Sequence, residues 1–360
     1  MIYHLFDALS IFTNFQYITF RAAIASVTAF LIATLLGGYI IRWLREAQFR
    51  ERTDKVHSKK LADLHASKNK TPSMGGLFMI GAMVISVLLF VDLTRAIVLI
   101  ALGVTVAMWI LGFVDDWVKL QSEEKHGIRP LVKLYFQCLI GLSGGVALYL
   151  YFGEYQPELT RLYVPMISET VAIGSIYPVL VMLVIVSTSN AVNLSDGLDG
   201  LAIGLAIMVA LVYAVIAYVT GRQDFSSYLE IPMVMGAGEV AIMMIAFVGG
   251  GMGFLWYNCH PAQVFMGNTG SLPVGGLIGI VAVITKQELV LLITGGVFVV
   301  EALSVILQIL SYKVRGKRIF NIAPIHHHFE FKGWDEPKIV VRFWIAATVF
   351  AILSLAFLKL

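Results

Sequence analysis

Two adjacent carboxylates in the stretch FVDDWVK are the residues of this sequence best suited to chemistry. Asp115 and Asp116 follow a run at 96–114 that is otherwise apolar and long enough to cross a bilayer. A charge at membrane depth is costly, so carboxylates kept there indicate a functional site. The alternative is a helix that ends here with both carboxylates in water. Neighbouring residues on a helix point about 100° apart, so we expect different tasks: Asp115 facing a phosphate group, Asp116 facing a lysine or a metal ion.

Polar residues recur at every third position of the stretch NAVNLSDGLDGLA. At this spacing, neighbours lie on nearly one face of a helical turn. Such a face suits a hard cation or a sugar with several hydroxyls, whereas the alternative is a polar turn between two helices. The row consists of Asn190, Asn193, Asp196 and Asp199.

Glycines and asparagines dominate the next polar stretch, NCHPAQVFMGNTGSLPVGG. A glycine-rich turn that opens a helix can form an anion-binding nest of backbone N–H groups. Asn258 and Asn268 add carbonyl oxygens that can serve as ligands. The stretch therefore predicts a loop that binds an anion or contributes to a cation site.

Three consecutive histidines, His326, His327 and His328, lie in the stretch RIFNIAPIHHHFEFKGW. Three neighbours cannot all face one way on a helix or a strand, so we expect one or two to meet a phosphate or a sugar while the others pack. A transition-metal site is the alternative. Phosphate contact is favoured because no cysteine accompanies the histidines and the other polar stretches offer oxygen ligands.

Four further residues are candidates for phosphate contact. Lys70 and Thr71 lie in the stretch KNKTPSMGG, at the end of a basic segment whose alternative partner is anionic lipid headgroups. Lys119 and Lys133 flank the aspartate pair, and they either bind phosphate or offset the two carboxylates.

The composition indicates an all-α, polytopic integral membrane protein. Hydrophobic residues make up 58% of the 360 residues, charged residues 14%, and the mean hydropathy is +0.83, whereas about a quarter of an ordinary soluble protein is charged. The two cysteines imply no disulfide framework. We find no short-period repeat, so we expect a single domain over 1–360, with the lipid bilayer as its environment and no nucleic-acid partner.

About ten segments are apolar enough to span a bilayer by the criterion of about 20 residues. The ninth would be roughly 36 Å long as a straight helix, longer than a bilayer core of about 30 Å. Because Gly295-Gly296 lies inside it, we expect a tilt or a break. The segments are 18–41, 74–92, 96–114, 131–152, 174–189, 200–220, 237–257, 272–285, 289–312 and 339–358.

The basic residues predict the orientation of the chain. The loops after the first, third and ninth segments, together with the first four residues of the segments that follow them, carry nine, four and seven of the 26 Lys and Arg residues. That side is therefore cytoplasmic and both termini are periplasmic. Every motif described above falls in a loop on this basic side. We therefore expect the motifs to converge on one site at the cytoplasmic face.

The motifs FVDDWVK, NAVNLSDGLDGLA, FMGNTGS and APIHHHFE, in this order across ten spans, resemble the phospho-N-acetylmuramoyl-pentapeptide transferases, the bacterial translocase I family. This family belongs to the polyprenyl-phosphate N-acetylhexosamine-1-phosphate transferase superfamily. The resemblance implies transfer of phospho-MurNAc-pentapeptide from UDP-MurNAc-pentapeptide to undecaprenyl phosphate, which gives lipid I and UMP with Mg²⁺. This is the first membrane step of peptidoglycan synthesis, at the bacterial inner membrane.

The resemblance also implies roles for particular residues. Both aspartates of the pair are catalytic in the family, with the first, here Asp115, favoured as the base toward the lipid phosphate. The family further implies a broken ninth helix and a homodimer. Nucleotide or sugar contacts are implied at Lys70, Lys133, Asn190, Asp196, Asn258, His326, His327 and His328.

One position departs from the family pattern. The family has a third essential aspartate in the motif FMGD, usually a Mg²⁺ ligand, where this chain has Asn268. An amide oxygen can still ligate Mg²⁺ beside Asp115 and Asp116, but it brings no negative charge. We expect weaker metal binding. Two accounts stay open: an inactivated variant, or natural divergence for which Asp196 or Asp199 compensates. A route through a covalent phospho-aspartyl intermediate at this position is excluded for Asn268.

Two other functions remain as alternatives. A sibling transferase that uses UDP-GlcNAc is the nearer one, but its histidine motif is interrupted, whereas HHH is continuous here. A secondary transporter would also carry intramembrane carboxylates, but near mid-bilayer rather than at the ends of spans on one face.

Overall fold

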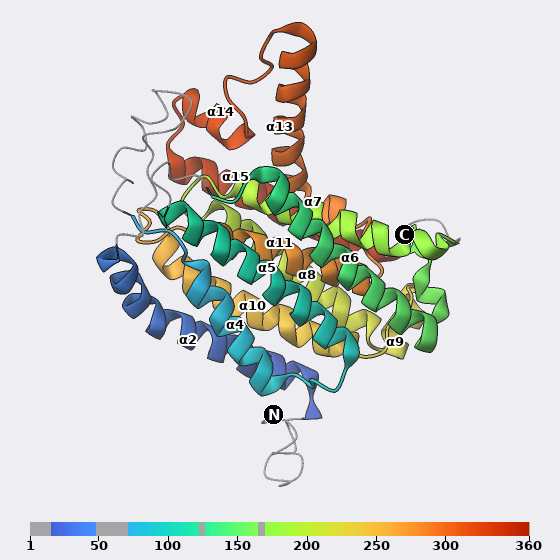
Figure 1. Ribbon diagram of the computed structural model, residues 1–360. Coiled ribbons are helices and arrows are strands. Elements are labelled where there is room, and N and C mark those ends of the chain that lie inside the picture. Colours follow the sequence, from blue (N-terminus) through green and yellow to red (C-terminus); the bar gives the residue numbers. More distant parts are fainter. Residues whose placement is uncertain (1–15, 48–70, 122–126, 165–169, 360) are drawn as a thin grey trace.

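The computed structural model describes residues 16–47, 71–121, 127–164 and 170–359, and these residues form a bundle of helices (Figure 1). Eight helices are long and apolar enough to span a membrane, and two shorter apolar helices accompany them. The spanning helices are α2 (Ile18–Glu46), α5 (Ala96–Gln121), α6 (Pro130–Tyr155), α7 (Tyr177–Ser195), α8 (Leu201–Thr220), α10 (Ala237–Asn258), α13 (Gly296–Arg315) and α15 (Glu336–Ala356); the shorter ones are α4 (Gly76–Phe90) and α11 (Asn268–Ile284).

Short elements connect these helices. The only strands within the described ranges are β1 (Leu162–Tyr163) and β2 (Thr170–Val171), which pair antiparallel with Leu162 opposite Val171. The prediction of an all-α polytopic membrane protein is therefore confirmed. The remaining helical turns are η4 (Pro157–Thr160), η5 (Gly174–Ile176), α9 (Gln223–Leu229), α12 (Leu291–Thr294), α14 (Ile325–Phe331) and η6 (Phe357–Lys359).

Each of the ten predicted segments overlaps a helix, but two boundaries differ in a way that matters for function. The third segment was expected to end at residue 114, yet α5 continues to Gln121, so Asp115 and Asp116 lie inside the helix. The eighth begins at Asn268 rather than at 272, which places Asn268 in the first turn of α11.

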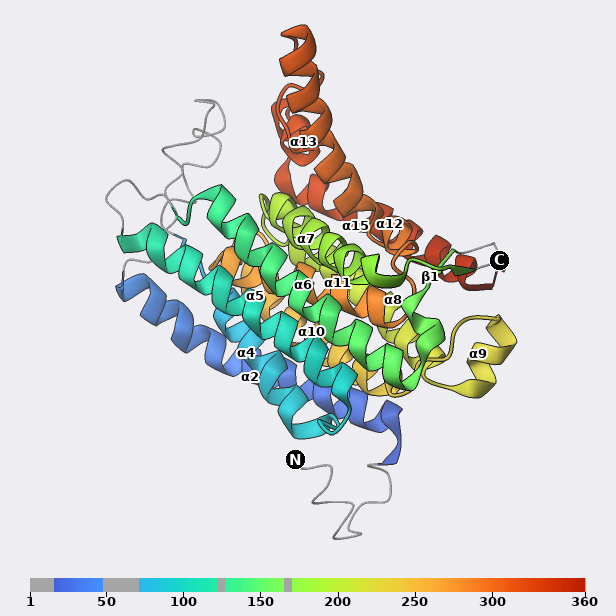
Figure 2. The ribbon, with the colours of Figure 1, turned by 45° about the vertical axis from the view of Figure 1, so that its right-hand side comes forward.

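Helix α11 is the centre of the bundle, because all of its residues are buried. It contacts α5 and α7, which carry the polar motifs (Figure 2). Two glycines allow these helices to approach closely: a Cβ at Gly112 of α5 would lie 2.1 Å from the carbonyl oxygen of Asn268, and one at Gly275 of α11 would lie 2.4 Å from the Cα of Ser189. Such close contacts hold the ends of α5, α7 and α11 in one place.

The ninth predicted segment is broken at Gly295. Helix α12 ends at Thr294 and α13 begins at Gly296, so the excess length is accommodated by a break. Beyond the break α13 leaves the bundle, with α14 beside it (Figures 1 and 2). Apolar side chains on α13, among them Leu303, Ile306 and Leu310, are exposed, which suits a helix surrounded by lipid.

A buried ion pair joins three elements at the end of the bundle opposite the polar motifs. Both terminal nitrogens of Arg21 in α2 contact Glu239 in α10, at 2.6 and 2.7 Å. Arg21 also donates to the carbonyl of Phe90, the last residue of α4, and Glu239 accepts the N–H of Asp92 at 2.8 Å. Almost no solvent reaches Arg21, so this pair holds α2, α4 and α10 together.

We expect Glu239→Gln to lower the free energy of unfolding by about 3–5 kcal/mol, because the guanidinium stays buried without its counter-charge. Unfolding of the purified protein in detergent, followed by circular dichroism, measures this loss. Asp224→Asn is the matched control, since the Arg222–Asp224 pair is exposed at a comparable 2.8 Å, and we expect it to change nothing measurable. Equal effects of the two variants would contradict the prediction.

Candidate active site

The two aspartates of α5 are buried, so the alternative of a helix that ends in water is wrong. Asp115 is 1% exposed and Asp116 is 5% exposed. One oxygen of Asp115 accepts the N–H of Ile128 at 2.8 Å. One oxygen of Asp116 accepts both the N–H and the hydroxyl of Thr269, each at 2.8 Å. Asp116 therefore holds the first turn of α11, while Asp115 faces the loop that precedes α6.

Two lysines compensate these carboxylates. Lys119 lies one turn on in α5, and its Nζ is 3.1 Å from Asp115 Oδ2 and 3.1 Å from Asp116 Oδ1. Lys133, from α6, brings its Nζ to 3.9 Å from the same oxygen of Asp115. The lysines thus offset the carboxylates, which was one of the two predicted roles. Lys119 is also 39% exposed, so its ammonium remains reachable by an anion from solution.

Asn268 completes this group of residues. Its Nδ2 donates to Asp115 Oδ2, and its Oδ1 accepts from Asn193 Nδ2 at 2.5 Å. Asn193 also donates to Ser271 Oγ at 2.7 Å. Side chains from α5, α6, α7 and α11 therefore meet in one cluster, called the carboxylate cluster below: Asp115, Asp116, Lys119, Lys133, Asn193, Asn268 and Thr269.

The loop that precedes α4 closes one side of the carboxylate cluster. Gly267 has φ +67°, and a Cβ there would lie 2.6 Å from Asp116 Oδ2 and 2.8 Å from Ser73 Oγ. Thr71 donates from its hydroxyl to the carbonyl of Ala262 at 3.4 Å. Ser73 is thus at the rim of the cluster, Thr71 bonds the loop at Ala262, and Lys70 lies outside the described residues. Phosphate contact by Thr71 stays a prediction.

The prediction that the row Asn190, Asn193, Asp196 and Asp199 shares one face is wrong, because α7 ends at Ser195. Asn193 bonds into the carboxylate cluster. Asn190 faces α6, where its Nδ2 donates to Gln137 Oε1 at 3.1 Å. Asp196 caps the end of α7, and the turn beyond it, in which Gly200 has φ +77°, carries Asp199 in a different direction.

Asp199 belongs to a second polar group, which joins three loops. Its Oδ2 accepts the N–H of Ala262 at 3.1 Å and lies 3.0 Å from His260 Nδ1. Glu336 accepts the N–H of Asp199 at 2.7 Å and approaches His260 to 3.6 Å. The ligand atoms lie within 4.8 Å of one another, but they are already engaged with each other, so we assign them to fastening the loops. Asn258 acts similarly, bonding Gly200 and Val264.

The three histidines face two ways, as predicted. A Cβ at Gly197 would lie 2.3 Å from His326 Nε2 and 3.2 Å from His327 Nε2, so both rings face the loop that follows α7. His328 turns away and accepts the N–H of Asn321 at 3.1 Å. Partial burial, and then Lys332, lower the pKa of His328 below its usual range, so it is neutral at pH 7 and suited to accept this bond.

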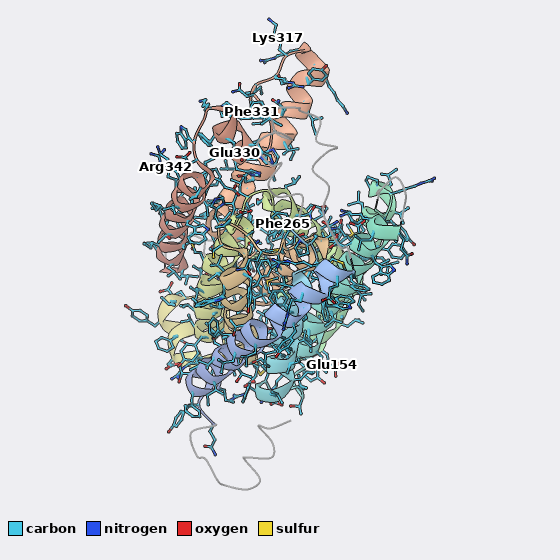
Figure 3. The ribbon with its side chains drawn as sticks, turned by 90° about the vertical axis from the view of Figure 1, so that its left-hand side faces the viewer. Glu154, Phe265, Lys317, Glu330, Phe331 and Arg342 are labelled. Carbon is cyan, nitrogen blue, oxygen red and sulfur yellow. The ribbon has the colours of Figure 1, made fainter. Side chains whose placement is uncertain are left out.

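Carboxylates that the sequence reasoning missed hold the two other rings. His326 Nδ1 lies 3.0 Å from Glu301 Oε2, and His327 Nδ1 lies 2.5 Å from Glu330 Oε2. Figure 3 shows Glu330 and Phe265 toward the end of the molecule away from Glu154. A signal for Glu301 was available, since it is the single acid in α13 and intramembrane acids are costly. His260 and Glu336 gave no such signal.

The polar motifs thus gather at one end of a bundle of membrane helices. Residues 98–286, which hold the carboxylate cluster, match the family described as glycosyl transferase family 4. This match identifies the chain as a member of glycosyl transferase family 4.

The relatives narrow the class. The chain is 47% identical to the phospho-N-acetylmuramoyl-pentapeptide-transferase of Citrifermentans bemidjiense, and 45% identical to those of Pelobacter propionicus and Desulfatibacillum aliphaticivorans, in each case over 100% of both chains. The chain belongs to the phospho-N-acetylmuramoyl-pentapeptide-transferase family. The family resemblance of the motifs is therefore confirmed, and neither the UDP-GlcNAc transferase nor the transporter is favoured.

Proposed function

We propose that this enzyme transfers phospho-MurNAc-pentapeptide from UDP-MurNAc-pentapeptide to undecaprenyl phosphate at the cytoplasmic face of the bacterial inner membrane. An oxygen of the lipid phosphate attacks the β-phosphorus of the nucleotide sugar, the bond from that phosphorus to UMP breaks, and lipid I and UMP result. The observation that carries the proposal is the carboxylate cluster: two buried aspartates with two lysines, at the end of the bundle to which the basic loops belong.

Charge neutralisation is the first requirement of this reaction, because both substrates are anionic. Lys119 and Lys133 supply two positive charges beside Asp115, and Lys119 is open to solution. A phosphate monoester has a second pKa of about 6, so the lipid phosphate is mostly a dianion at pH 7. A base therefore contributes little to its ionisation, and we assign Asp115 chiefly to positioning the lysines and the lipid phosphate.

The donor set of the carboxylate cluster fits Mg²⁺, because this ion prefers carboxylate and carbonyl oxygens. Asp115 Oδ2 and Asp116 Oδ1 already share one cation, the ammonium of Lys119. Asn268 turns its Nδ2 toward Asp115, so its amide must rotate before Oδ1 can serve as a ligand. Bound there by Asp115, Asp116 and Asn268, the ion would neutralise charge on the diphosphate and on the departing UMP.

The nucleophile follows from the residue at position 268. An amide cannot form a phospho-enzyme, so direct attack by the lipid phosphate is the route we propose. Thr269 keeps α11 against Asp116 through two hydrogen bonds, which keeps Asn268 beside Asp115 during the reaction.

The substrate is tested by supplying the purified protein with undecaprenyl phosphate and either UDP-MurNAc-pentapeptide or UDP-GlcNAc, with Mg²⁺ or with EDTA. We expect a lipid-linked product and UMP from the first nucleotide sugar alone, and at least about a tenfold loss in EDTA, because the diphosphate charge is then poorly neutralised. Product from UDP-GlcNAc instead would support the sibling transferase. No lipid product from either would contradict the proposed function.

Orientation and assembly complete the proposal. The basic loops support a cytoplasmic site with both termini periplasmic, and the family resemblance supports a homodimer. Labelling of single cysteines introduced near each terminus, and native mass spectrometry of the detergent-solubilised protein, test these two points.

A further inference from the structure

We propose that Glu301 is a positioning residue of the active site, which orients the imidazole of His326 through Nδ1 so that Nε2 faces a bound phosphate or sugar group. The inference rests on the function proposed above. It concerns a carboxylate that lies beyond the break in the ninth segment, in the second turn of α13.

Glu301 and His326 form a sealed pair. Both side chains are 0% exposed, and Glu301 Oε2 is 3.0 Å from His326 Nδ1. The second atom of each group, Glu301 Oε1 and His326 Nε2, is buried and has no hydrogen-bond partner within the described parts of the chain. A buried polar atom without a partner is costly. Because the backbone of Gly197 covers Nε2, a substrate group becomes its partner when this loop moves aside.

The direction of Nε2 identifies where that partner would bind. The atom faces the backbone of Gly197, where a Cβ would lie 2.3 Å away. Gly197 follows α7, and α7 carries Asn193, which bonds to Asn268 of the carboxylate cluster. Only a glycine allows the ring to approach this closely. His326 is therefore positioned beside the loop that leads directly to the carboxylate cluster.

The carboxylate determines which nitrogen of the ring is available. With Nδ1–H donating to Glu301, Nε2 is left toward the site, and the ring cannot turn without losing this bond. Because Nδ1 is engaged by Glu301, Nε2 is the ring atom that bonds a phosphate or a sugar group of the substrate.

The broken helix explains how Glu301 reaches His326. Helix α13 contacts both α7 and α14, and α14 contributes the histidine as its second residue. The break at Gly295 turns α13 out of the bundle (Figure 1), and α14 packs against α13. The break thus brings an acid, a histidine and the loop after α7 together.

The test compares Glu301→Gln, which keeps the size but removes the charge, with Glu301→Asp and His326→Gln. We expect Glu301→Gln to lower kcat by about 10–100-fold, with KM for UDP-MurNAc-pentapeptide within about twofold, and Glu301→Asp to recover part of the loss. The double variant should lose no more than His326→Gln alone, because Glu301 acts through that ring. Additive losses would overturn the inference.

Ser304→Ala is the matched control for packing. Ser304 is buried on the same helix, and its hydroxyl donates to the backbone carbonyl of Glu301, so we expect kcat to stay unchanged. If Ser304→Ala and Glu301→Gln lower the thermal stability and kcat alike, Glu301 is only a structural residue and the inference fails.

An NMR experiment separates this inference from the proposed function. In protein labelled with ¹⁵N-histidine, the resonances of His326 are those missing in His326→Gln. We expect Nδ1 to be protonated, the ring shifts to change in Glu301→Gln, and Nε2 to shift on addition of UDP-MurNAc-pentapeptide. An unchanged ring in Glu301→Gln overturns the inference even in an active enzyme. Absence of turnover in the wild type overturns the proposed function, while these shifts still decide the role of Glu301.

Discussion

We expect Asp115→Asn to lower kcat by about 10²–10³-fold. This is the magnitude typical of removing one preorganised charge from an active site. The carboxylate positions Lys119 and Lys133. Without its charge, Lys133 loses the carboxylate beside it and Lys119 keeps only that of Asp116. The overall fold should survive, because asparagine keeps the size of the side chain and can still accept the N–H of Ile128.

Asp116→Asn separates the tasks of the two aspartates. Its carboxylate accepts two bonds from Thr269 and thereby anchors the start of α11. We therefore expect this variant to lower thermal stability as well as kcat, whereas Asp115→Asn affects mainly kcat. Steady-state kinetics across pH and thermal unfolding of both variants provide the comparison. Asp92→Asn, a buried carboxylate at the opposite end of the molecule, should leave kcat unchanged.

The pH–rate profiles decide whether Asp115 is also a base. If it removes a proton from the lipid phosphate, Asp115→Asn changes the acidic limb of the profile and Asp116→Asn does not. Equal losses with identical profiles would remove the base role, and a fully active Asp115→Asn would contradict the site itself.

Asn268→Asp is expected to lower the Mg²⁺ concentration for half-maximal activity by at least about tenfold, which corresponds to about 1.4 kcal/mol of binding. The substitution adds a negative charge next to Asp115, where the wild-type amide supplies none. Two unit charges about 4 Å apart interact by about 4 kcal/mol near a protein surface, so a tenfold change is a conservative expectation.

The same substitution should make stability depend on the ion. Without Mg²⁺, a third carboxylate beside Asp115 and Asp116 is repelled, so the melting temperature of Asn268→Asp in EDTA should fall below that of the wild type. Mg²⁺ should restore it. Asn268→Ala, which removes the amide, should raise the Mg²⁺ requirement instead. Identical Mg²⁺ titrations of Asn268→Asp and Asn268→Ala would show that position 268 does not bind the ion.

Much of this protein follows from the sequence alone. The helical membrane architecture, the break near Gly295, the gathering of the motifs at one end and the family were all predicted, and the described helices and the relatives agree with them. The count of ten spans stays a prediction. These features depend on local properties: the length of an apolar run, the charge of a loop, and the identity of a few adjacent residues. They can therefore be predicted without knowing which helices pack against each other.

Only the tertiary structure decided which polar residues meet. Asn190 and Asn193 belong to one motif, yet one bonds Gln137 and the other enters the carboxylate cluster, because α7 packs against both α6 and α11. Glu301 and His326 are 25 residues apart, and Asp199 and Glu336 are 137 apart. Contacts of this kind depend on how closely glycine-bearing helices approach and on where each helix stops, and neither quantity is contained in the spacing of residues along the chain.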